Sequence, residues 1–445
     1  MNSSTATINK SNRTWLVCFL IAAVVANIVG ISVIYYFAAI ILLIIFVKSS
    51  DEDNFYVAVF LLPMIRILDG VGFTFMINLL LAVPLVMYCL KKRKILINGL
   101  ILLLMIIEFV HVLVLGYVDT IPSTISAFFG LIYCYSIFMD KEISLSYERA
   151  WTFLTTGVIT SSFVYFIVNR DFLRNIFSFI SSGRRFAALN SDPNIYALFI
   201  CLSLAMFFTL KRQRVIHYIA VAYMAFLGLL TGSKSCIMLM LITIILGLLN
   251  YLIGTKDMSR KRKVAVGLLI LIFGAALVFH EDILTMIMNI SNRAGLGNGT
   301  ISLDRLTGDR YSILQSYLSI LGSNIICLLL GYGLHYDRFL IHDSSYGFDY
   351  NYQAHNTYLD VILSWGIVGL IVFGILIVLI IKGLKKRWGI RREFVYYLPL
   401  IVLMLNIFVI SCLYATMFWW AVFLAFLPTL EYKNQTKIDN ARLYK

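Results

Sequence analysis

The sequence predicts an all-α, polytopic integral membrane protein with about 12–14 transmembrane helices. The chain has 445 residues, of which 60% are hydrophobic and only 13% are charged, and its mean hydropathy is +0.88. Soluble domains contain roughly 45–50% apolar and about 25% charged residues. The apolar residues form long runs, many near the roughly 20 residues that an α-helix needs to cross a bilayer. Segments of about ten alternating residues, typical of membrane barrels, are absent from the sequence, so helices carry the fold.

Successive apolar runs define the candidate spans. The third run is short and contains Pro63 and Arg66, so we expect it to be tilted, broken or re-entrant. An even number of spans places both chain termini on the same side of the membrane. The fourteen candidate spans are residues 15–29, 33–47, 55–68, 72–90, 95–116, 121–139, 151–168, 194–210, 215–230, 235–253, 264–279, 356–381, 395–411 and 413–430.

The distribution of lysine and arginine predicts the orientation. Cytoplasmic loops retain these residues, whereas translocated loops usually lack them. The basic connections at residues 91–94, 211–214, 254–263 and 382–393 all fall on one side, which is therefore predicted to be cytoplasmic. Both termini, including the tail at 431–445, are expected on this side. The net charge of +14 is mostly a topology signal, and no nucleic-acid partner is needed to explain it.

Two long segments then remain outside, at residues 169–193 and 280–355. Residues 311–330 are long enough to cross, but a crossing there would reverse the orientation of every later basic loop. We therefore expect an amphipathic helix on the outer surface. Its predicted apolar side consists of Ile313, Leu314, Tyr317, Leu318 and Leu321. No repeat or linker divides the chain, so residues 1–445 are expected to form a single membrane domain.

Arginine is in excess on the predicted outer side, where it accounts for nine of the ten basic residues. A planar guanidinium can bind two oxygens of a phosphate or carboxylate at once, which an ammonium group cannot do. The excess therefore favours an outer site for an anionic, phosphorylated substrate. The alternative is that individual arginines contact lipid phosphates or pair with nearby aspartates. The outer basic residues are Arg66, Arg170, Arg174, Arg184, Arg185, Arg293, Arg305, Arg310, Arg338 and Lys234.

Three stretches resemble a known family. Residues 183–199 read GRRFAALNSDPNIYALF, and residues 306–314 read LTGDRYSIL. Residues 331–339 (GYGLHYDRF) are followed by QAHNTYLDVILSWGIVGLIVF at 353–373. Their order and their position on two large outer loops resemble the O-antigen polymerase and ligase superfamily, which includes the Wzy-type polymerases. The turn LTGSKS at 230–235 is similar to the family's Thr-Gly-Ser-Arg turn, although a lysine stands where arginine is common.

The resemblance implies a glycosyltransferase that acts on polyprenyl-diphosphate-linked sugars at the outer face of the bacterial cytoplasmic (inner) membrane, without a metal or other cofactor. A polymerase of O-antigen, capsule or exopolysaccharide would transfer the glycan from polyprenyl diphosphate to an incoming lipid-linked repeat unit. A ligase, the nearest alternative, would transfer it to lipid A-core or another acceptor. The expected partners are the lipid-linked oligosaccharide, the bilayer, a chain-length regulator and a flippase.

A lipid-linked sugar flippase or other transporter is the second alternative. Transporters usually place their working charges near the bilayer midplane. Here the main candidate at that depth is Glu108. The other charged residues concentrate in the predicted outer loops and the basic connections, which favours an enzyme.

The chemistry of glycosyl transfer requires stabilisation of the leaving diphosphate and a base for the acceptor hydroxyl. The resemblance assigns the first role to Arg310 and Arg185. His355 is the predicted base, because an imidazole with an ordinary pKa of about 6.5 is substantially neutral at neutral pH. The alternative is that His355 is an interfacial residue that caps the following helix together with Asn356.

Six further residues are predicted to contact the substrate. Two of them flank Pro193 and also suit a helix start, because Asp is a strong N-cap and Pro suits the first helical position. The polyprenyl chain is expected to enter sideways from the bilayer, through a groove between spans near the arginines. The predicted substrate contacts are Arg184, Asp192, Asn194, Arg305, Asn356 and His335.

Overall fold

The computed structural model describes residues 10–69, 80–116, 118–176, 185–190, 192–254, 310–340, 353–413 and 415–431. Its first half contains α1 (Lys10–Val29), α2 (Ser32–Lys48), α3 (Asp51–Leu61), η1 (Leu62–Met64), α5 (Val83–Lys92), α6 (Gly99–Leu115), η3 (Val118–Thr120), α7 (Ile121–Met139), α8 (Tyr147–Val168) and α9 (Arg170–Arg174). Its second half contains α11 (Pro193–Phe207), α12 (Val215–Leu230), α13 (Lys234–Gly254), α17 (Arg310–Ser323), α18 (Ile325–Leu330), α19 (Asp337–Leu340), α20 (Thr357–Arg387), η6 (Phe394–Tyr397), α21 (Leu398–Ile407), α22 (Thr416–Phe426) and η7 (Leu427–Thr429). Two short strands, β1 (Gly389–Ile390) and β2 (Leu430–Glu431), pair antiparallel.

The predicted all-α membrane class is confirmed. Four helices of the described residues are long and apolar enough to cross a membrane, and several shorter apolar helices accompany them. Each predicted span within the described residues contains a helix, while the predicted span 264–279 lies outside them. The four long spans are Asn12–Val29, Val118–Met139, Tyr147–Val168 and Thr357–Arg387.

The third predicted span is broken. Helix α3 ends at Leu61 and gives way to η1, which contains Pro63. Proline lacks a backbone N–H and cannot continue a regular α-helical ladder. The Pro63 carbonyl accepts a hydrogen bond from the Ser161 hydroxyl at 2.9 Å. A side chain of α8 therefore satisfies a backbone group that the break leaves buried.

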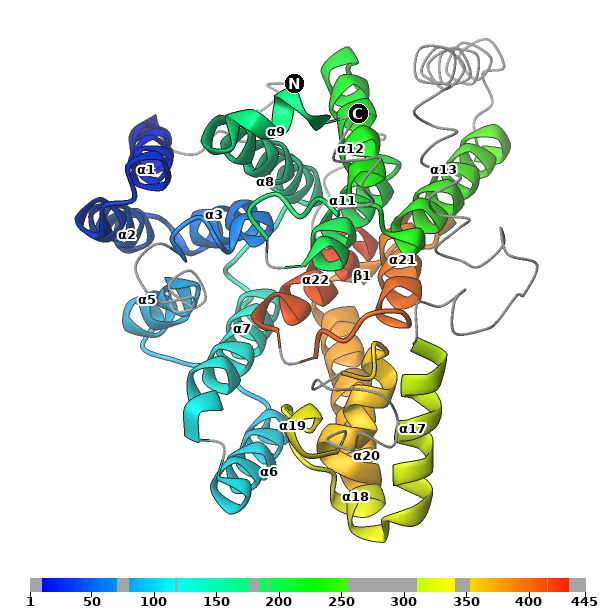
Figure 1. The fold of residues 1–445 in the computed structure, drawn as a ribbon. Coiled ribbons are helices and arrows are strands. Elements are labelled where there is room, and N and C mark those ends of the chain that lie inside the picture. The colour runs from blue at the N-terminus through cyan, green and yellow to red at the C-terminus, as the bar shows by residue number, and fades with distance from the viewer. Residues whose placement is uncertain are drawn as a thin grey trace.

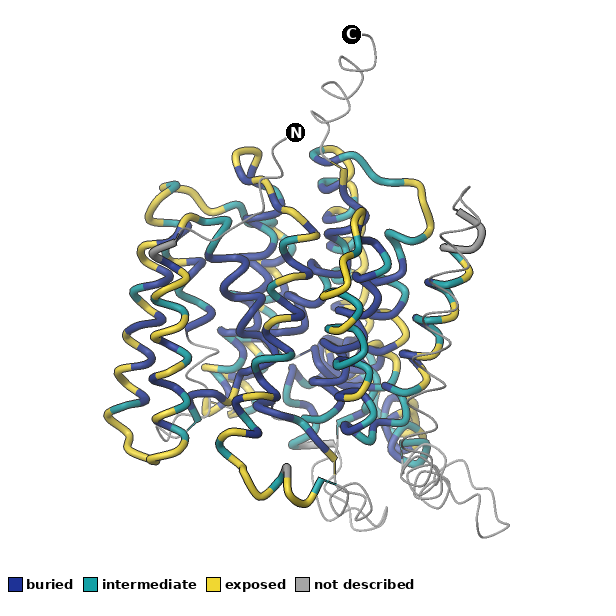
Figure 2. The backbone as a smooth tube through the Cα atoms, turned by 90° about the horizontal axis from the view of Figure 1, so that it is seen from above, coloured by how far each residue is buried: buried dark blue, intermediate teal, exposed yellow. Residues whose placement is uncertain are grey.

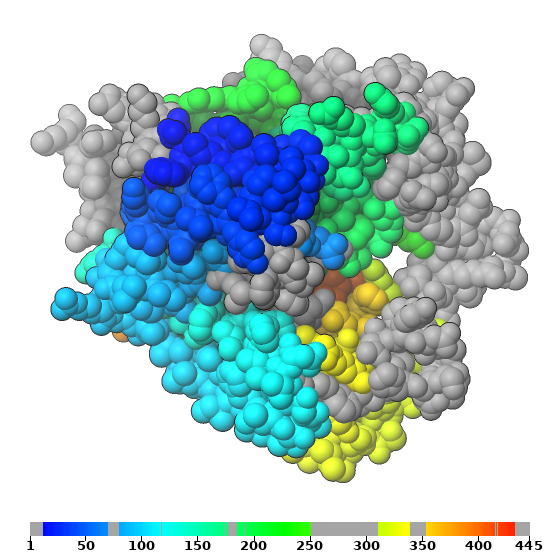
Figure 3. Space-filling view, turned by 60° about the vertical axis from the view of Figure 1, so that its left-hand side comes forward, coloured from blue at the N-terminus to red at the C-terminus, as the bar shows by residue number. Residues whose placement is uncertain are grey.

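Helix α11 lies at the centre of the bundle. All residues from Asn194 to Phe207 are buried, and α8, α12, α13, α21 and α22 pack around the helix (Figure 1). Helices α1, α2 and α6 lie at the periphery of the bundle. In the space-filling view, the surfaces of α1 and α2 (blue) and of α5, α6 and α7 (light blue to cyan) lie next to one another (Figure 3). These outer helices expose apolar side chains such as Val33 (72%) and Val114 (76%). Such an apolar outer surface is what a bilayer requires of a spanning protein.

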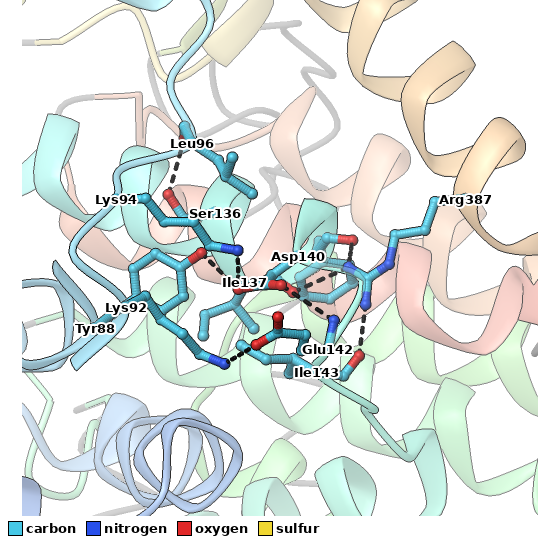
Figure 4. A network of polar contacts seen from close by, with 11 residues as sticks. Tyr88, Lys92, Lys94, Leu96, Ser136, Ile137, Asp140, Glu142, Ile143 and Arg387 are labelled. Carbon is cyan, nitrogen blue, oxygen red and sulfur yellow. Dashed lines mark hydrogen bonds and ion pairs between the residues drawn. The ribbon is translucent and has the colours of Figure 1, made fainter.

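Polar contacts join several helix connections on one face, which we call the basic face. We define it by the connections at residues 49–50, 93–98, 140–146 and 388–397. The Tyr88 hydroxyl donates to Asp140 at 2.8 Å, and Lys92 pairs with Glu142 at 2.6 Å (Figure 4). Arg387 at the end of α20 donates to the Phe138 carbonyl at the end of α7 and to the Ile143 carbonyl of the 140–146 connection. Connections predicted to share one side of the membrane therefore lie together.

A second group of connections lies on the opposite face, which we call the site face, because the helices run across the molecule in roughly one direction (Figure 2). We define it by the connections at residues 62–69, 169–176, 231–233, 353–356 and 408–413. The Phe186 N–H donates to the Leu230 carbonyl at 3.2 Å, and the Thr357 hydroxyl donates to the Ile410 carbonyl at 2.6 Å. The first bond joins the segment before α11 to the end of α12, and the second joins the start of α20 to the turn after α21.

Helix α20 is interrupted at Gly366, where φ is 63° and ψ is −168°. The interruption frees two backbone carbonyls in an apolar environment. The Tyr332 N–H donates to the Leu363 carbonyl at 2.8 Å, and the Gly333 N–H donates to the Ser364 carbonyl at 2.7 Å. The segment that follows α18 therefore supplies the donors that the interrupted helix lacks.

Glu108 of α6 fixes the same segment from the other side. Its carboxylate accepts hydrogen bonds from the Leu334 N–H at 3.0 and 3.1 Å and from the Trp365 indole N–H at 3.0 Å. Glu108 is 1% exposed. A buried carboxylate is tolerated when several donors satisfy it, so Glu108 ties α6 to both sides of the α18–α20 contact.

The predicted amphipathic helix at 311–330 is two helices. Asn324 separates α17 from α18, because its side chain accepts from the Ile326 and Cys327 N–H groups at 3.1 Å and caps the second helix. The expected apolar side is partly wrong, since Leu318 is 52% exposed. The buried apolar residues of α17 follow an i, i+4, i+8 stripe that is narrower than predicted. These residues are Ile313, Tyr317 and Leu321.

We expect Gly366→Ala to destabilise the protein strongly. A Cβ at Gly366 would lie 2.3 Å from the Leu329 carbonyl oxygen, and the backbone conformation is one that essentially only glycine adopts. Backbone strain alone costs about 1–3 kcal/mol. The matched control is Gly374→Ala in the same helix, where a Cβ meets nothing within 4 Å. Thermal unfolding in detergent should show a clear loss for Gly366→Ala only; equal unfolding temperatures for the two variants would contradict the described contact.

Candidate functional site

A cavity of about 620 Å³ opens among the helix ends of the site face. The starts of α11, α13, α17 and α20 surround it, and the turn after α21 completes it. Three cationic side chains and one imidazole contribute to its walls, and none of the described residues that line it is acidic. The lining residues are Arg185, Asn194, Gly232, Ser233, Lys234, Ser235, Met238, Arg310, Tyr311, Leu314, Ala354, His355, Asn356, Phe408 and Val409.

Arg185 is held by two neighbouring segments. Its Nη2 donates to Asn194 Oδ1 at 2.5 Å, and its Nε donates to the Thr231 carbonyl at 3.4 Å. Asp192 caps α11, because its carboxylate accepts from the Asn194 N–H at 2.5 Å. The Asp-Pro-Asn turn therefore starts α11, and its Asn194 side chain also holds Arg185 beside the cavity.

The turn at residues 231–235 forms a second wall. The Ser233 hydroxyl donates to Asn194 Oδ1 at 3.0 Å and lies 2.9 Å from the Ser235 hydroxyl. Asn194 thus joins Arg185 to this turn through one oxygen atom. Lys234 begins α13 and lines the cavity. Sequence reasoning noted this lysine as the one outer lysine, but did not include it or the two serines among the site residues.

Arg310 begins α17 and faces the same cavity. Burial lowers the pKa of its guanidinium first, and the charge of Arg185 lowers it further, while Asp192 opposes both effects. The group remains cationic, because the pKa of arginine starts above 12. Two arginines that influence each other in a half-buried cavity create a strong preference for an anionic ligand.

His355 lies at the mouth of α20 with φ at 51°, a left-handed conformation that is uncommon for residues other than glycine. Asn356 caps α20 by accepting from the Tyr358 and Leu359 N–H groups at 3.0 and 3.2 Å. The capping role belongs to Asn356, which leaves the imidazole facing the cavity. Burial lowers the pKa of His355 to about 4, Arg310 and Arg185 also lower it, and Asp192 raises it. The imidazole is therefore neutral at neutral pH.

An apolar groove of about 470 Å³ begins directly beside the cavity. Thr357 and Tyr358 line the end of the groove nearest the cavity and directly follow Asn356, which lines the cavity. Ile407 also lines the groove, and the next residue, Phe408, lines the cavity. The groove lies between α20, α21 and α22 and reaches Leu430 near the basic face. Its lining is almost entirely aliphatic and aromatic. An anionic head in the cavity and an apolar chain in the groove would be adjacent.

The structure places other predicted site residues elsewhere. The His335 ring lies 3.1 Å from the Ser123 hydroxyl and does not line the cavity. Arg184 and Arg305 lie outside the described residues. Among the remaining outer arginines, Arg338 pairs with Asp119 at 2.7 Å. The alternative of pairing with aspartates therefore applies to some outer arginines.

The other described pairs of this kind are Arg66 with Asp69 at 3.3 Å and Arg174 with Asp171 at 3.9 Å. Both pairs join residues three positions apart in the sequence. Within the described part of the chain, no three His, Cys, Asp or Glu side chains gather as metal ligands would.

Comparison with known families matches a segment that contributes part of this cavity. Residues 219–374 match the family described as O-antigen ligase. The matched segment begins in α12 and ends in α20, so it includes Lys234, Arg310 and His355 but not Arg185 or Asn194. No curated protein matches the chain significantly.

We expect His355 to stay reactive toward diethylpyrocarbonate down to about pH 5, because the reagent modifies the neutral imidazole and burial holds the pKa near 4. An unperturbed histidine loses reactivity near pH 6.5. In Arg310→Gln the midpoint should rise, since one cationic neighbour is removed. Peptide mass spectrometry of the purified protein gives the extent of modification, with His355→Gln identifying the peptide. A midpoint near 6.5 in the native protein would contradict the described environment.

Proposed function

The match over residues 219–374 supports membership of the O-antigen polymerase and ligase superfamily, whose activity is glycosyltransferase-like, and from this premise we propose that the protein polymerises lipid-linked oligosaccharide repeat units. It would transfer the glycan from polyprenyl diphosphate to a hydroxyl of an incoming lipid-linked repeat unit. The observation that carries the proposal is the single cavity that Arg185, Arg310 and His355 share, with an apolar groove at its edge.

The cations of the cavity suit the donor diphosphate. Arg185 and Arg310 would bind its oxygens, and Lys234 would add a third positive charge. During transfer the bond between the anomeric carbon and the diphosphate oxygen breaks, and its electron pair leaves with the diphosphate. The arginines stabilise the negative charge that develops on that oxygen.

His355 would act on the acceptor. The acceptor hydroxyl oxygen forms the new bond to the anomeric carbon, and its proton passes to the neutral imidazole. Burial lowers the pKa of His355 most in the free enzyme, and Arg310 and Arg185 lower it further. The bound diphosphate offsets their charge, so the imidazole becomes a stronger base once the donor is in place. General-base catalysis of this kind contributes about 10²- to 10⁴-fold in rate.

The apolar groove would hold the polyprenyl chain. Beyond the interruption at Gly366, the stretch from Ile367 to Leu384 is about 27 Å long at 1.5 Å per residue, close to the bilayer core of about 30 Å. The side chains of α21 and α22 close its other walls. A carrier lipid could then place its diphosphate among the arginines without leaving the bilayer.

An O-antigen ligase is the second candidate, because the matched family is described by that activity. Donor binding would be the same in both enzymes, and only the acceptor would differ. Transport has less support. Glu108, the main buried charge on α6, is held by Leu334 and Trp365, so it serves the contact between helices.

The proposed orientation places the site face outside the cytoplasm and the basic face inside it, in the cytoplasmic membrane of a bacterium. Both termini would then be cytoplasmic, as the lysine and arginine distribution favours. The reaction would need no metal, so activity should persist in a chelator. A flippase would supply the substrate, and a chain-length regulator would limit the product.

We expect His355→Gln and Arg310→Gln to lower polymer formation by about 100-fold or more, because one removes the base and the other a diphosphate ligand. Arg310→Lys should be intermediate, since it keeps the charge but loses the bidentate geometry. The matched control is Arg338→Gln, an outer arginine whose exposed pair with Asp119 lies away from the cavity. Surface glycans are profiled by gel in a deletion strain at matched membrane expression.

The deletion strain itself separates the candidate functions. A polymerase defect leaves one repeat unit attached to the final acceptor, and a ligase defect leaves undecorated acceptor with polymer on the lipid carrier. A transport defect retains the lipid-linked unit inside the cell. Normal glycan ladders from both His355→Gln and Arg310→Gln would refute the proposed site.

We expect Gly374→Phe to raise the KM for donors with a long polyprenyl chain by about tenfold, because the ring would fill the groove at a position where a Cβ meets nothing within 4 Å. Donors with a short chain should be unaffected. Ile375→Phe is the control, since Ile375 is 48% exposed and does not line the groove. Equal KM changes for long and short donors would remove the groove from the proposal.

A further inference from the structure

We propose that Tyr336 and Asp360 form a buried joint that positions His355 relative to the arginines of the cavity. The proposal rests on the base role proposed for His355 and adds two positioning residues that do not line the cavity. Tyr336 belongs to the segment between α18 and α19, and Asp360 lies in the first turn of α20. Both are 2% exposed.

The joint is a short chain of hydrogen bonds. The Tyr336 hydroxyl donates to Asp360 Oδ1 and accepts from the Ala354 N–H at 3.0 Å. The Ser411 hydroxyl donates to the same carboxylate oxygen at 2.8 Å. One phenol therefore connects the backbone just before His355 to α20 and, through the carboxylate, to the turn after α21.

The backbone conformation at His355 explains why this connection is needed. Its φ of 51° is sparsely populated for a residue with a Cβ, and such conformations persist only when their surroundings fix them. Tyr336 fixes Ala354 on one side, and the cap made by Asn356 fixes the other side. Without the phenol hydroxyl, one of the two constraints is lost and the imidazole can turn away from the cavity.

The same tyrosine also contacts the wall that carries Arg310. Its ring meets the Tyr317 ring edge-to-face, with the centroids 5.3 Å apart. Tyr317 belongs to α17, which Arg310 begins. A buried apolar cluster that includes Ile313 and Tyr336 packs the two segments together. The joint therefore sets the position of the base relative to a diphosphate ligand.

Packing alone does not explain a carboxylate at position 360. A buried carboxylate is costly unless its oxygens are satisfied, and an apolar side chain of the same size often packs as well or better. Its Oδ1 accepts two hydrogen bonds, whereas Oδ2 has no partner among the described atoms. The acceptor function toward Tyr336 and Ser411 accounts for the presence of the carboxylate at this position.

The first experiment compares Tyr336→Phe with Tyr88→Phe in the purified full-length enzyme, assayed with a lipid-linked oligosaccharide. Both substitutions remove a buried hydroxyl that donates to a buried aspartate, but Tyr88 and its partner Asp140 lie on the basic face (Figure 4). Tyr336→Phe should lower kcat by about 10- to 100-fold, as expected for a misplaced catalytic group, with KM changed by less than about threefold. Tyr88→Phe should leave kcat near the native value.

The second experiment changes the carboxylate. Asp360→Asn keeps an acceptor oxygen and should retain kcat within about fivefold, whereas Asp360→Leu should resemble Tyr336→Phe. In the impaired variants the acid limb of kcat/KM should move to higher pH, because the imidazole is no longer held in its buried position. A role in stability alone would not shift that limb.

The outcomes separate the joint from the proposed function. Native kcat in His355→Gln would refute the base role itself. An inactive His355→Gln with equal kcat for Tyr336→Phe and Tyr88→Phe would refute only the joint. If Tyr336→Phe does not accumulate in membranes, the Asp360 pair decides alone, and equal kcat for Asp360→Asn and Asp360→Leu would overturn the proposal.

Discussion

Backbone groups that leave a helix inside a membrane must find partners within the protein, and this constraint organises the half of the molecule that carries the cavity. The interruption at Gly366 frees carbonyls that accept hydrogen bonds from the segment after α18. Glu108 holds the same segment through the Leu334 N–H. Tyr336 follows two residues later and reaches the backbone beside His355. The position of the His355 side chain thus depends on hydrogen bonds made deeper in the protein.

The electrostatics of the cavity are coupled to its proposed chemistry. Arg185 and Arg310 together favour an anion and disfavour a proton on His355. Burial is the largest cause of the neutral imidazole, and the charges that would attract a diphosphate add to it. A bound diphosphate would offset those charges, so the affinity of the proposed base for a proton would rise when the donor is present. The acceptor would then be activated best after the donor has bound.

The sequence determines the spans well because their signal is local. The length of an apolar run predicts a helix, and the lysine and arginine pattern agrees with the connections that meet on the basic face. The family resemblance also points to Arg185, Arg310 and His355 as candidate site residues, and the fold brings these three side chains to one cavity. The relation between helices is not local. Nothing in the spacing indicates that Asn194 would join Arg185 to the turn of Lys234.

Two further differences have the same origin. Asn324 stops the helix predicted at 311–330, because its side chain competes for the backbone N–H groups that the helix would have used. His335 is predicted to contact the substrate, but its ring lies beside the Ser123 hydroxyl. Backbone N–H groups of its segment donate to α20 and to Glu108, and these bonds fix the position of the segment. Long-range contacts decide both positions, and hydrophobic periodicity does not report them.

The two faces use charge differently, and the difference bears on function. On the basic face each of several cations has an acidic partner, as in Lys92 with Glu142 and Lys94 with Asp140 (Figure 4). Each such pair holds two connections together, and its two opposite charges largely cancel. In the cavity the cations outnumber the acidic groups among the described lining residues. Burying like charges together opposes folding, so an arrangement of this kind favours the proposed anionic ligand over a purely stabilising role.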